Sequence, residues 1–183
     1  MPEITPRECT LQDGRKVQLL SPRDEHLPLY APFNQKMAGE TKWTMQIVGR
    51  IPAEERTKSF WDANRKSKTG LSVMALAKGE PVGLLAVHPE WEGHPWVEHL
   101  VGFGMFVLRD YWGSGLASVL VEEMHEHAKR AGIQRIEAMV RAKNERGVAF
   151  YKKHGYTIEG TRKHAAIIDG VSHDEYYIAR LFL

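Results

Sequence analysis

The stretch at residues 105–128 constrains the fold most, because three kinds of pattern follow one another within it. An apolar run ends at residues 106–108, glycines follow within 113–115, and apolar residues then recur at helical spacing from Leu116 to Ala131. This order predicts a strand, a tight turn and an amphipathic helix with one buried face.

The turn itself offers backbone amides to an anion. Gly113, Ser114 and Gly115 place small side chains at the predicted helix start. Unpaired N–H groups and the positive end of the helix dipole favour a group such as pyrophosphate at this place. A turn of this kind also opens many ordinary helices, so it does not identify the ligand by itself.

A second motif begins at Asn144, after an apolar run that is predicted to be a strand. Asn144 suits a helix N-cap, and Gly155 suits the residue that ends the helix. Asn144, Val148 and Tyr151 are spaced i, i+4 and i+7, so they share one face of this short helix. A polar cap and a phenol are therefore predicted to face the same way.

The two motifs read Trp112-x-x-Gly115-x-Ala117 and Asn144-x-x-Gly147-x-x-x-Tyr151-x-x-x-Gly155-Tyr156. Together they resemble the GCN5-related N-acetyltransferase (GNAT) family, in which the corresponding patterns are Gln/Arg-x-x-Gly-x-Gly/Ala and Asn-x-x-Ala-x-x-x-Tyr-x-x-x-Gly-Phe. Trp112 replaces the usual Gln or Arg, as it does in some branches of the family. The resemblance runs from about Asp13 to the C-terminus.

The order of the other patterns agrees with this resemblance. Hairpin signals flank single helices and strands, and such an order predicts a mixed sheet. The resemblance implies an α/β fold of the α+β type, with a mostly antiparallel central sheet, flanking helices and a splayed strand pair that holds the cofactor. We expect an N-terminal arm at residues 1–12 and a single domain at 13–183.

Prolines and loops shape the predicted substrate side of the domain. Pro28 and Pro32 predict a broken or displaced helical segment at residues 29–37, and a second helix is predicted at 52–66. The strand before the glycine turn is predicted to span about residues 97–108. The expected walls around the substrate are residues 27–43, the loop at 89–95 and the hairpin around 169–177.

By the same resemblance, acetyl-CoA is the cosubstrate, and its pantetheine arm pairs with the strand before the glycine turn as though it were another strand. An amide near Met105 or Phe106 would hold the thioester oxygen as charge develops on it. The residues implied to bind the cofactor are Phe106, Val107, Leu108, Trp112, Gly113, Ser114, Gly115, Leu116, Ala117, Ser118, Asn144 and Tyr151.

Acetyl transfer to an amine requires proton movements at both ends. A lysine-like amine, with a pKa of about 10.4, is roughly one part in two thousand neutral at pH 7, so a base is useful. The departing thiolate gains from a proton, which a tyrosine can donate at a cost of about 2 kcal/mol. Tyr151 stands at the family's general-acid position, and its alternative role is that of a core tyrosine.

The base is the point at which this sequence differs most from the family. Many relatives carry a glutamate about five positions before the valine that matches Val107, where this chain has Gly102. Gly102 and Gly104 either open room for a substrate or let a helix pack closely. Glu98 and His99 are the nearest titratable candidates, acting through water, although either can be an ordinary solvated residue. Direct attack by an amine that arrives neutral is a further alternative.

Composition limits the partners and the location. A chain of 183 residues with a formal net charge of +2 does not require nucleic acid or an anionic membrane as a partner. Cys9 is the only cysteine, which excludes internal disulfides, and His125 and His127 lie two apart on a helix, so no metal site is predicted. The polar N-terminus and the lack of a long apolar run favour a soluble cytoplasmic protein. A homodimer is compatible with the sequence.

These observations predict an acetyl-CoA-dependent N-acetyltransferase that transfers acetyl to a primary amine, in a small molecule or a peptide, by direct attack in a ternary complex. Two alternatives stay open. The missing strand glutamate would suit a non-catalytic acyl-CoA-binding sensor of the same fold. Gly113-x-Gly115-x-x-Ser118 would suit a dinucleotide-binding oxidoreductase less well, because its third glycine is a serine and Glu137 falls inside a predicted strand.

Overall fold

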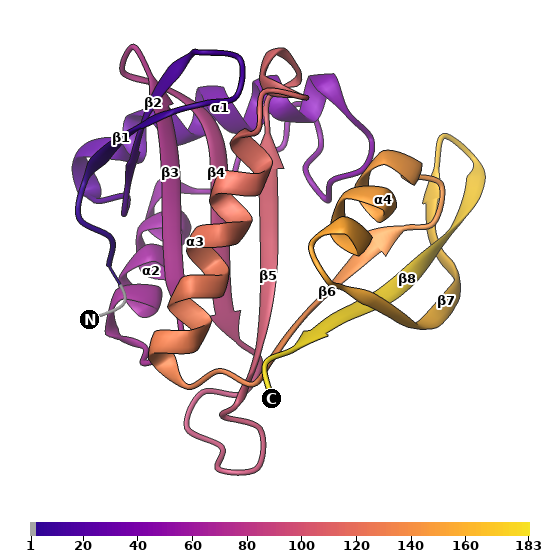
Figure 1. Cartoon of the computed structure of the whole chain (residues 1–183). Coiled ribbons are helices and arrows are strands. Elements are labelled where there is room, and N and C mark those ends of the chain that lie inside the picture. The colour runs from indigo at the N-terminus through magenta and orange to yellow at the C-terminus, as the bar shows by residue number, and fades with distance from the viewer. Residues whose placement is uncertain (1–2) are drawn as a thin grey trace.

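The computed structural model describes residues 3–183 as an eight-stranded sheet with helices on both faces (Figure 1). The strand order is β1-β2-β3-β4-β5-β6-β8-β7. The strands are β1 Arg7–Thr10, β2 Lys16–Leu20, β3 Leu71–Ala77, β4 Glu80–Pro89, β5 Leu100–Val107, β6 Arg135–Arg141, β7 Thr157–Ile168 and β8 Val171–Leu181. The helices are α1 Leu27–Glu40, α2 Glu54–Lys66, α3 Leu116–Ala131 and α4 Glu145–Lys153, with short 3₁₀ helices η1 Asp24–His26 and η2 Arg109–Tyr111.

The sheet is mixed. Among the paired strands of residues 3–183, β5 and β6 run parallel and the other neighbours run antiparallel. This arrangement confirms the mixed, mostly antiparallel fold class that was predicted from the sequence.

Helix α3 covers one face of the sheet. It packs against β3, β4 and β5, and Leu116, Leu120 and Met124 are fully buried along its inner face. In Figure 1, α3 lies in front of these strands, whereas α1 and α2 lie behind them. The helical spacing that predicted an amphipathic helix after the glycine turn is therefore confirmed.

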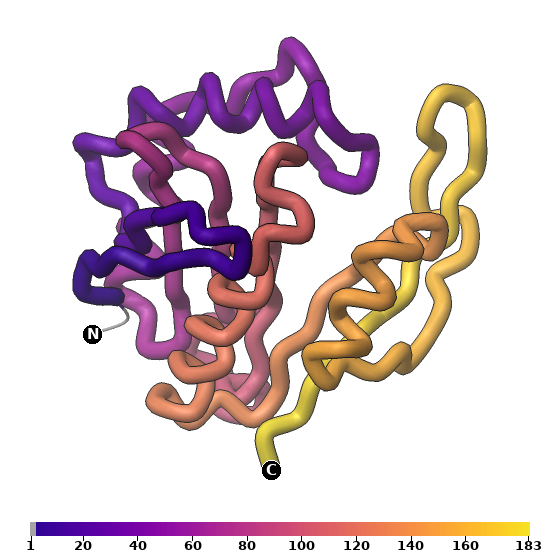
Figure 2. Tube along the Cα trace, turned by 45° about the horizontal axis from the view of Figure 1, so that its top comes forward, coloured from indigo at the N-terminus to yellow at the C-terminus, as the bar shows by residue number. Residues whose placement is uncertain are grey.

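The parallel pairing of β5 with β6 is short. It begins at Leu100 opposite Arg135 and ends at Gly102 opposite Glu137. Beyond this point β5 stays paired with β4, while β6 stays paired with β8. Figure 2 shows the result, because the backbones of α4, β7 and β8 diverge from the N-terminal part of the chain beyond the point where β5 and β6 meet. Side chains still bridge the two parts, as in the ion pair of Lys42 with Asp169 and the contact of Arg146 with Trp112. The splayed strand pair implied by the resemblance is present.

Helix α1 differs from the prediction. The expected broken segment at residues 29–37 was wrong, because α1 runs without interruption from Leu27 to Glu40. Pro28 lies in the first turn, where its missing N–H has no helical partner. The N–H that Pro32 lacks would have bonded to Pro28, so the loss falls at the helix start, and the buried ring of Phe33 holds this turn against the core.

Part of the predicted N-terminal arm belongs to the sheet. Arg7–Thr10 form β1 and pair with β2, and Ile4 is buried with its N–H donating to Ser21 Oγ at 3.0 Å. The arm predicted at residues 1–12 is therefore wrong for this part. An edge strand with mostly exposed residues shows no alternating apolar pattern from which it could be predicted. Residues 1–2 lie outside the described residues.

Within residues 3–183, no helix combines the length and the apolar character that crossing a membrane requires.

Candidate active site

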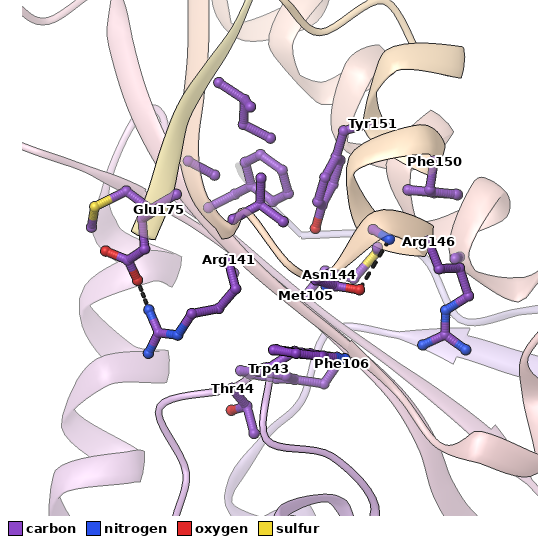
Figure 3. A pocket seen from close by; sticks show the side chains of 18 of the residues that line it. Trp43, Thr44, Met105, Phe106, Arg141, Asn144, Arg146, Phe150, Tyr151 and Glu175 are labelled. Carbon is purple, nitrogen blue, oxygen red and sulfur yellow. Dashed lines mark hydrogen bonds and ion pairs between the residues drawn. The ribbon is translucent and has the colours of Figure 1, made fainter. Parts of the chain in front are cut away.

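A cavity of about 1240 Å³ lies where β5 and β6 diverge. Its lining comes from the end of β5, the glycine turn, β6, the start of α4, the segment after α1 and the β7–β8 hairpin. Figure 3 shows Tyr151 on one side of this space and Trp43 and Thr44 across from it. Segments far apart in the sequence therefore share one site.

The glycine turn has a backbone that only glycine adopts readily. Gly113 and Gly115 have φ values of 77° and 92°, and Gly115 is the N-cap of α3. The Ser114 hydroxyl donates to Tyr111 O at 2.7 Å and accepts from Leu116 N at 3.3 Å, so it holds the turn together. Because the cap residue Gly115 has no side chain, no side chain of the cap covers the amides that follow Leu116, and they stay open toward the cavity.

The residues predicted to bind the cofactor separate into two groups. Those that line the cavity are Phe106, Val107, Trp112, Gly113, Gly115, Ala117, Ser118, Asn144 and Tyr151. The side chains of Leu108, Ser114 and Leu116 are instead buried in the core, with exposed fractions of 3%, 1% and 0%. For these three residues, a contact with the cofactor stays a prediction and is restricted to the backbone.

Two arginines flank Trp112 beside the glycine turn. The Arg146 guanidinium carbon lies 3.1 Å from the centre of the Trp112 ring, and that of Arg109 lies at 5.5 Å. The indole Nε1 donates to Val107 O at 2.8 Å and fixes the ring. Arg146 lines the cavity and gives its mouth a positive charge beside Trp112, which stands where the family motif has Gln or Arg. Arg109 does not line the cavity, and its amide donates to Glu40 Oε2 at 2.6 Å. Sequence reasoning missed these arginines because they come from η2 and α4, and nothing in their spacing joins them to Trp112.

Asn144 caps α4, as its position in the motif predicted. Its Oδ1 accepts from Gly147 N at 3.1 Å. A Cβ added at Gly147 would lie 2.5 Å from Asn144 Nδ2, so the glycine that replaces the family's alanine leaves space for this cap. Asn144 also lines the cavity, and its contact with the cofactor stays a prediction.

Tyr151 is held by aromatic rings and directs its hydroxyl into the cavity (Figure 3). The rings of Phe103 and Tyr156 lie 5.6 Å from its ring, and that of Phe150 lies at 5.4 Å. Burial raises the pKa of Tyr151 to about 12. The phenol is therefore protonated at neutral pH, which suits a proton donor and not a base.

These features can be compared with known proteins. Residues 36–156 match the sequence profile of the Acetyltransferase (GNAT) family. The chain belongs to this family. It is 32% identical over 124 residues to the L-amino acid N-acetyltransferase AaaT of Escherichia coli K12, and the match covers 67% of this chain and 75% of that protein. The chain is thus an N-acetyltransferase, and the oxidoreductase alternative is set aside.

Solved structures agree with this family. A GNAT acetyltransferase from Streptococcus pneumoniae has a TM-score of 0.85 and 25% identity, over 91% of this chain and 99% of that chain. A GNAT phosphinothricin acetyltransferase from Sinorhizobium meliloti, in complex with acetyl-CoA, has a TM-score of 0.79 and 15% identity, over 95% and 89%. The second likeness is one of fold alone.

The predicted bases are placed differently from the rest of this GNAT site. Glu98 and His99 precede β5, whereas the glycine turn follows it, and neither residue lines the cavity. The long strand predicted from residue 97 starts at Leu100, and His99 O accepts instead from Gln134 N at 2.9 Å and Arg135 N at 3.1 Å. The structure therefore does not bring these two residues together with Tyr151.

Other titratable groups line the GNAT cavity in their place. They are His88, Glu90, Arg135, Glu137, Arg141, Arg146, Lys153, Glu159, Arg162 and Glu175. Of the loop expected as a wall at residues 89–95, Glu90 alone contributes to the lining, whereas the segment after α1 and the β7–β8 hairpin contribute as expected. Sequence spacing gave no signal for this set, because its members come from β4 and the residue after it, and from β6, α4, β7 and β8.

Two arginines share one carboxylate on the hairpin side of the cavity. Arg141 forms an ion pair with Glu175, and both side chains are 7% exposed. Arg162 Nη1 lies 3.4 Å from the second oxygen of Glu175. Within this group of three side chains, which we call the positive wall, one carboxylate faces two guanidinium groups, so one positive charge is left over and suits an anionic part of a ligand.

Proposed function

We propose that this domain transfers acetyl from acetyl-CoA to a primary amine by direct attack in a ternary complex. One observation carries the proposal: the end of β5 that lacks a β6 partner, the open start of α3 and the Tyr151 hydroxyl all face one cavity. In this arrangement the pyrophosphate binds at the glycine turn beside Arg109 and Arg146, and the pantetheine arm follows β5. The thioester then lies near the amide of Met105 or Phe106.

The reaction needs no covalent enzyme intermediate. The amine lone pair forms the C–N bond, the C–S bond breaks, and the thiolate takes a proton that Tyr151 supplies. Between a tyrosine pKa of about 12 and a thiol pKa of about 8.5, this transfer is uphill by about 5 kcal/mol if the thiolate is in water. The buried surroundings that raise the pKa of Tyr151 also raise the pKa of the thiol, and so reduce the difference between the two pKa values. Cys9, on β1, does not line the cavity.

An L-amino acid is the acceptor class that we propose first. The relative from Escherichia coli is an L-amino acid N-acetyltransferase. In this chain, Arg141 and its partner Glu175 lie on the side of the cavity away from Arg146 (Figure 3), and Arg162 lies 3.4 Å from Glu175. This positive wall provides a place for the α-carboxylate. A peptide N-terminus has no carboxylate at this distance from its amine, and so makes a poorer match.

The acceptor class is tested by thiol release from acetyl-CoA with L-amino acids, the amines made from them by removing the carboxylate, and short peptides. We expect the amino acids to have the higher kcat/KM. Arg162→Gln is expected to raise the KM for amino acids about tenfold and to leave the KM for the decarboxylated amines within about twofold. Lys163→Gln is the matched control, because Lys163 pairs with Asp174 and does not line the cavity.

Each outcome of this test has a clear meaning. Equal rates with amino acids and decarboxylated amines contradict the carboxylate assignment but leave the acetyltransferase intact. Binding of acetyl-CoA without thiol release on any amine favours the non-catalytic sensor. The reducing cytoplasm as location and a homodimeric state stay predictions from the sequence.

A further inference from the structure

The space above Gly102 is occupied by side chains of the neighbouring strand. A Cβ added at Gly102 would overlap Glu90 Oε1 and would lie 2.9 Å from His88 Nε2. His88 lies on β4 and Glu90 directly follows this strand, and both side chains are 41% exposed and line the cavity. The space that Gly102 leaves is therefore neither empty nor filled by a helix, because the imidazole of His88 and the carboxylate of Glu90 occupy it.

The strand register directs this pair toward the place where the thioester binds. His88 lies opposite Gly102, Ala86 opposite Gly104, and Leu84 opposite Phe106. Paired residues of antiparallel strands share a face, so the imidazole and Phe106 stand on the same side of the sheet. A Cβ at Gly104 would meet nothing within 4 Å, and so the strip between them is open.

The length of this strip suits a substrate. Phe106 lies four positions after Gly102 along the strand, which is a span of about 13 Å. We expect the amine and a single water to occupy this strip between the imidazole of His88 and the thioester. The amine would therefore lie between His88 and the thioester, with no protein side chain from β5 in its way.

The surroundings of His88 determine which nitrogen can exchange protons with the cavity. Nδ1 is buried and has no hydrogen-bond partner within residues 3–183, so the cavity side of the ring is Nε2. Glu90 Oε1 lies 3.7 Å from Nε2, and the Phe60 ring of α2 covers another side at 6.3 Å. From β6, Glu137 lines the same cavity but is held by Arg135 at 2.7 Å. The carboxylate beside Nε2 is therefore that of Glu90.

We propose that His88 is the base of this acetyltransferase, taking a proton from the incoming ammonium group through a bound water, and that Glu90 is a positioning residue that stabilises the imidazolium. The proposal rests on the proposed function. One N–H bond of the ammonium breaks, its proton reaches Nε2, and the freed lone pair forms the C–N bond. The nitrogen loses a second proton on becoming an amide, and this proton restores the Tyr151 phenol after Tyr151 has given its own proton to the sulfur. His88 then returns its proton to solvent.

The test compares His88→Gln with wild type on two nucleophiles. With an L-amino acid, which arrives protonated, we expect kcat/KM at pH 7 to fall about 100-fold and its rise with pH to move toward the amine's own pKa. With an aminooxy acid, which arrives neutral at pH 7, we expect rates within about threefold of wild type. Glu90→Gln is expected to lower the rate with the L-amino acid about tenfold and to leave the rate with the aminooxy acid unchanged.

Two controls keep the result interpretable. Calorimetry with acetyl-CoA checks that each variant retains the folded cofactor site, and His94→Gln is a matched change on the exposed loop outside the cavity. Wild-type rates and pH profile in His88→Gln would overturn the proposal, as would an equal loss on both nucleophiles, which indicates a structural role. Loss of the pH response in His99→Gln instead would identify His99, which precedes β5, as the base. A wild type without amine-dependent thiol release would refute the proposed function itself.

Discussion

Replacing Tyr151 with phenylalanine is expected to lower kcat about 100- to 1000-fold and to leave the affinity for acetyl-CoA within about threefold of wild type. The substitution removes one hydroxyl and keeps the ring that contacts Phe103 and Phe150. The thiolate then has to leave without a nearby proton donor. Steady-state thiol release gives kcat, and calorimetry gives the affinity.

Two further observations would separate this role from a structural one. Tyr30→Phe is the matched control, since Tyr30 is also a partly buried tyrosine but packs on Trp61 outside the cavity. Because burial raises the pKa of Tyr151 to about 12, its acid form persists as pH rises, and the enzyme should not lose activity through this group near pH 10. A Tyr151→Phe variant with wild-type kcat, or one that loses acetyl-CoA binding, would contradict the assignment.

Replacing Gly115 with alanine is expected to raise the Kd for acetyl-CoA at least about tenfold. The φ of Gly115 is +92°, and a Cβ would lie 2.9 Å from Gln12 Cγ. A residue with a Cβ costs roughly 1–2 kcal/mol in this conformation, so the turn shifts and its amides no longer point at the pyrophosphate. The free energy of unfolding should fall as well.

Gly79→Ala is the control for the strain alone. Gly79 has a φ of +84° with nothing within 4 Å of the added Cβ, and it lies in the β3–β4 turn outside the cavity. We expect both variants to have a lower Tm, whereas only Gly115→Ala should bind acetyl-CoA more weakly in a calorimetric titration. If both variants bind acetyl-CoA as wild type does, the glycine turn is not the phosphate site.

The parts of the site that lie close together in the sequence could be predicted from it. Residues 106–118 set strand, turn and helix in one continuous stretch, and i, i+4, i+7 spacing set Asn144 and Tyr151 on one face of α4. These patterns depend on local geometry, which the residues of each element determine without contacts from distant parts of the chain. The same local pattern placed Ser114 in the turn, but it could not predict whether the Ser114 side chain faces the core or the cavity.

The parts that depend on strand register could not be predicted. His88 reaches the space at Gly102 only because β4 and β5 pair with these two residues opposite each other, across a connection of irregular structure. Glu98 and His99 are nearer in sequence to the same strand and yet lie beyond the cavity. Arg146 likewise reaches Trp112 through the packing of α4 beside the glycine turn. Proximity in sequence is a poor guide wherever separate elements supply one site.

The most direct test of direct transfer is the initial rate of thiol release over a matrix of acetyl-CoA and L-amino acid concentrations. Direct transfer requires reciprocal plots that intersect and thiol release that depends on the amine. It also requires that no acetyl group is left on the protein when the amine is omitted. Parallel plots together with an acetylated protein would show a covalent intermediate and contradict the ternary complex.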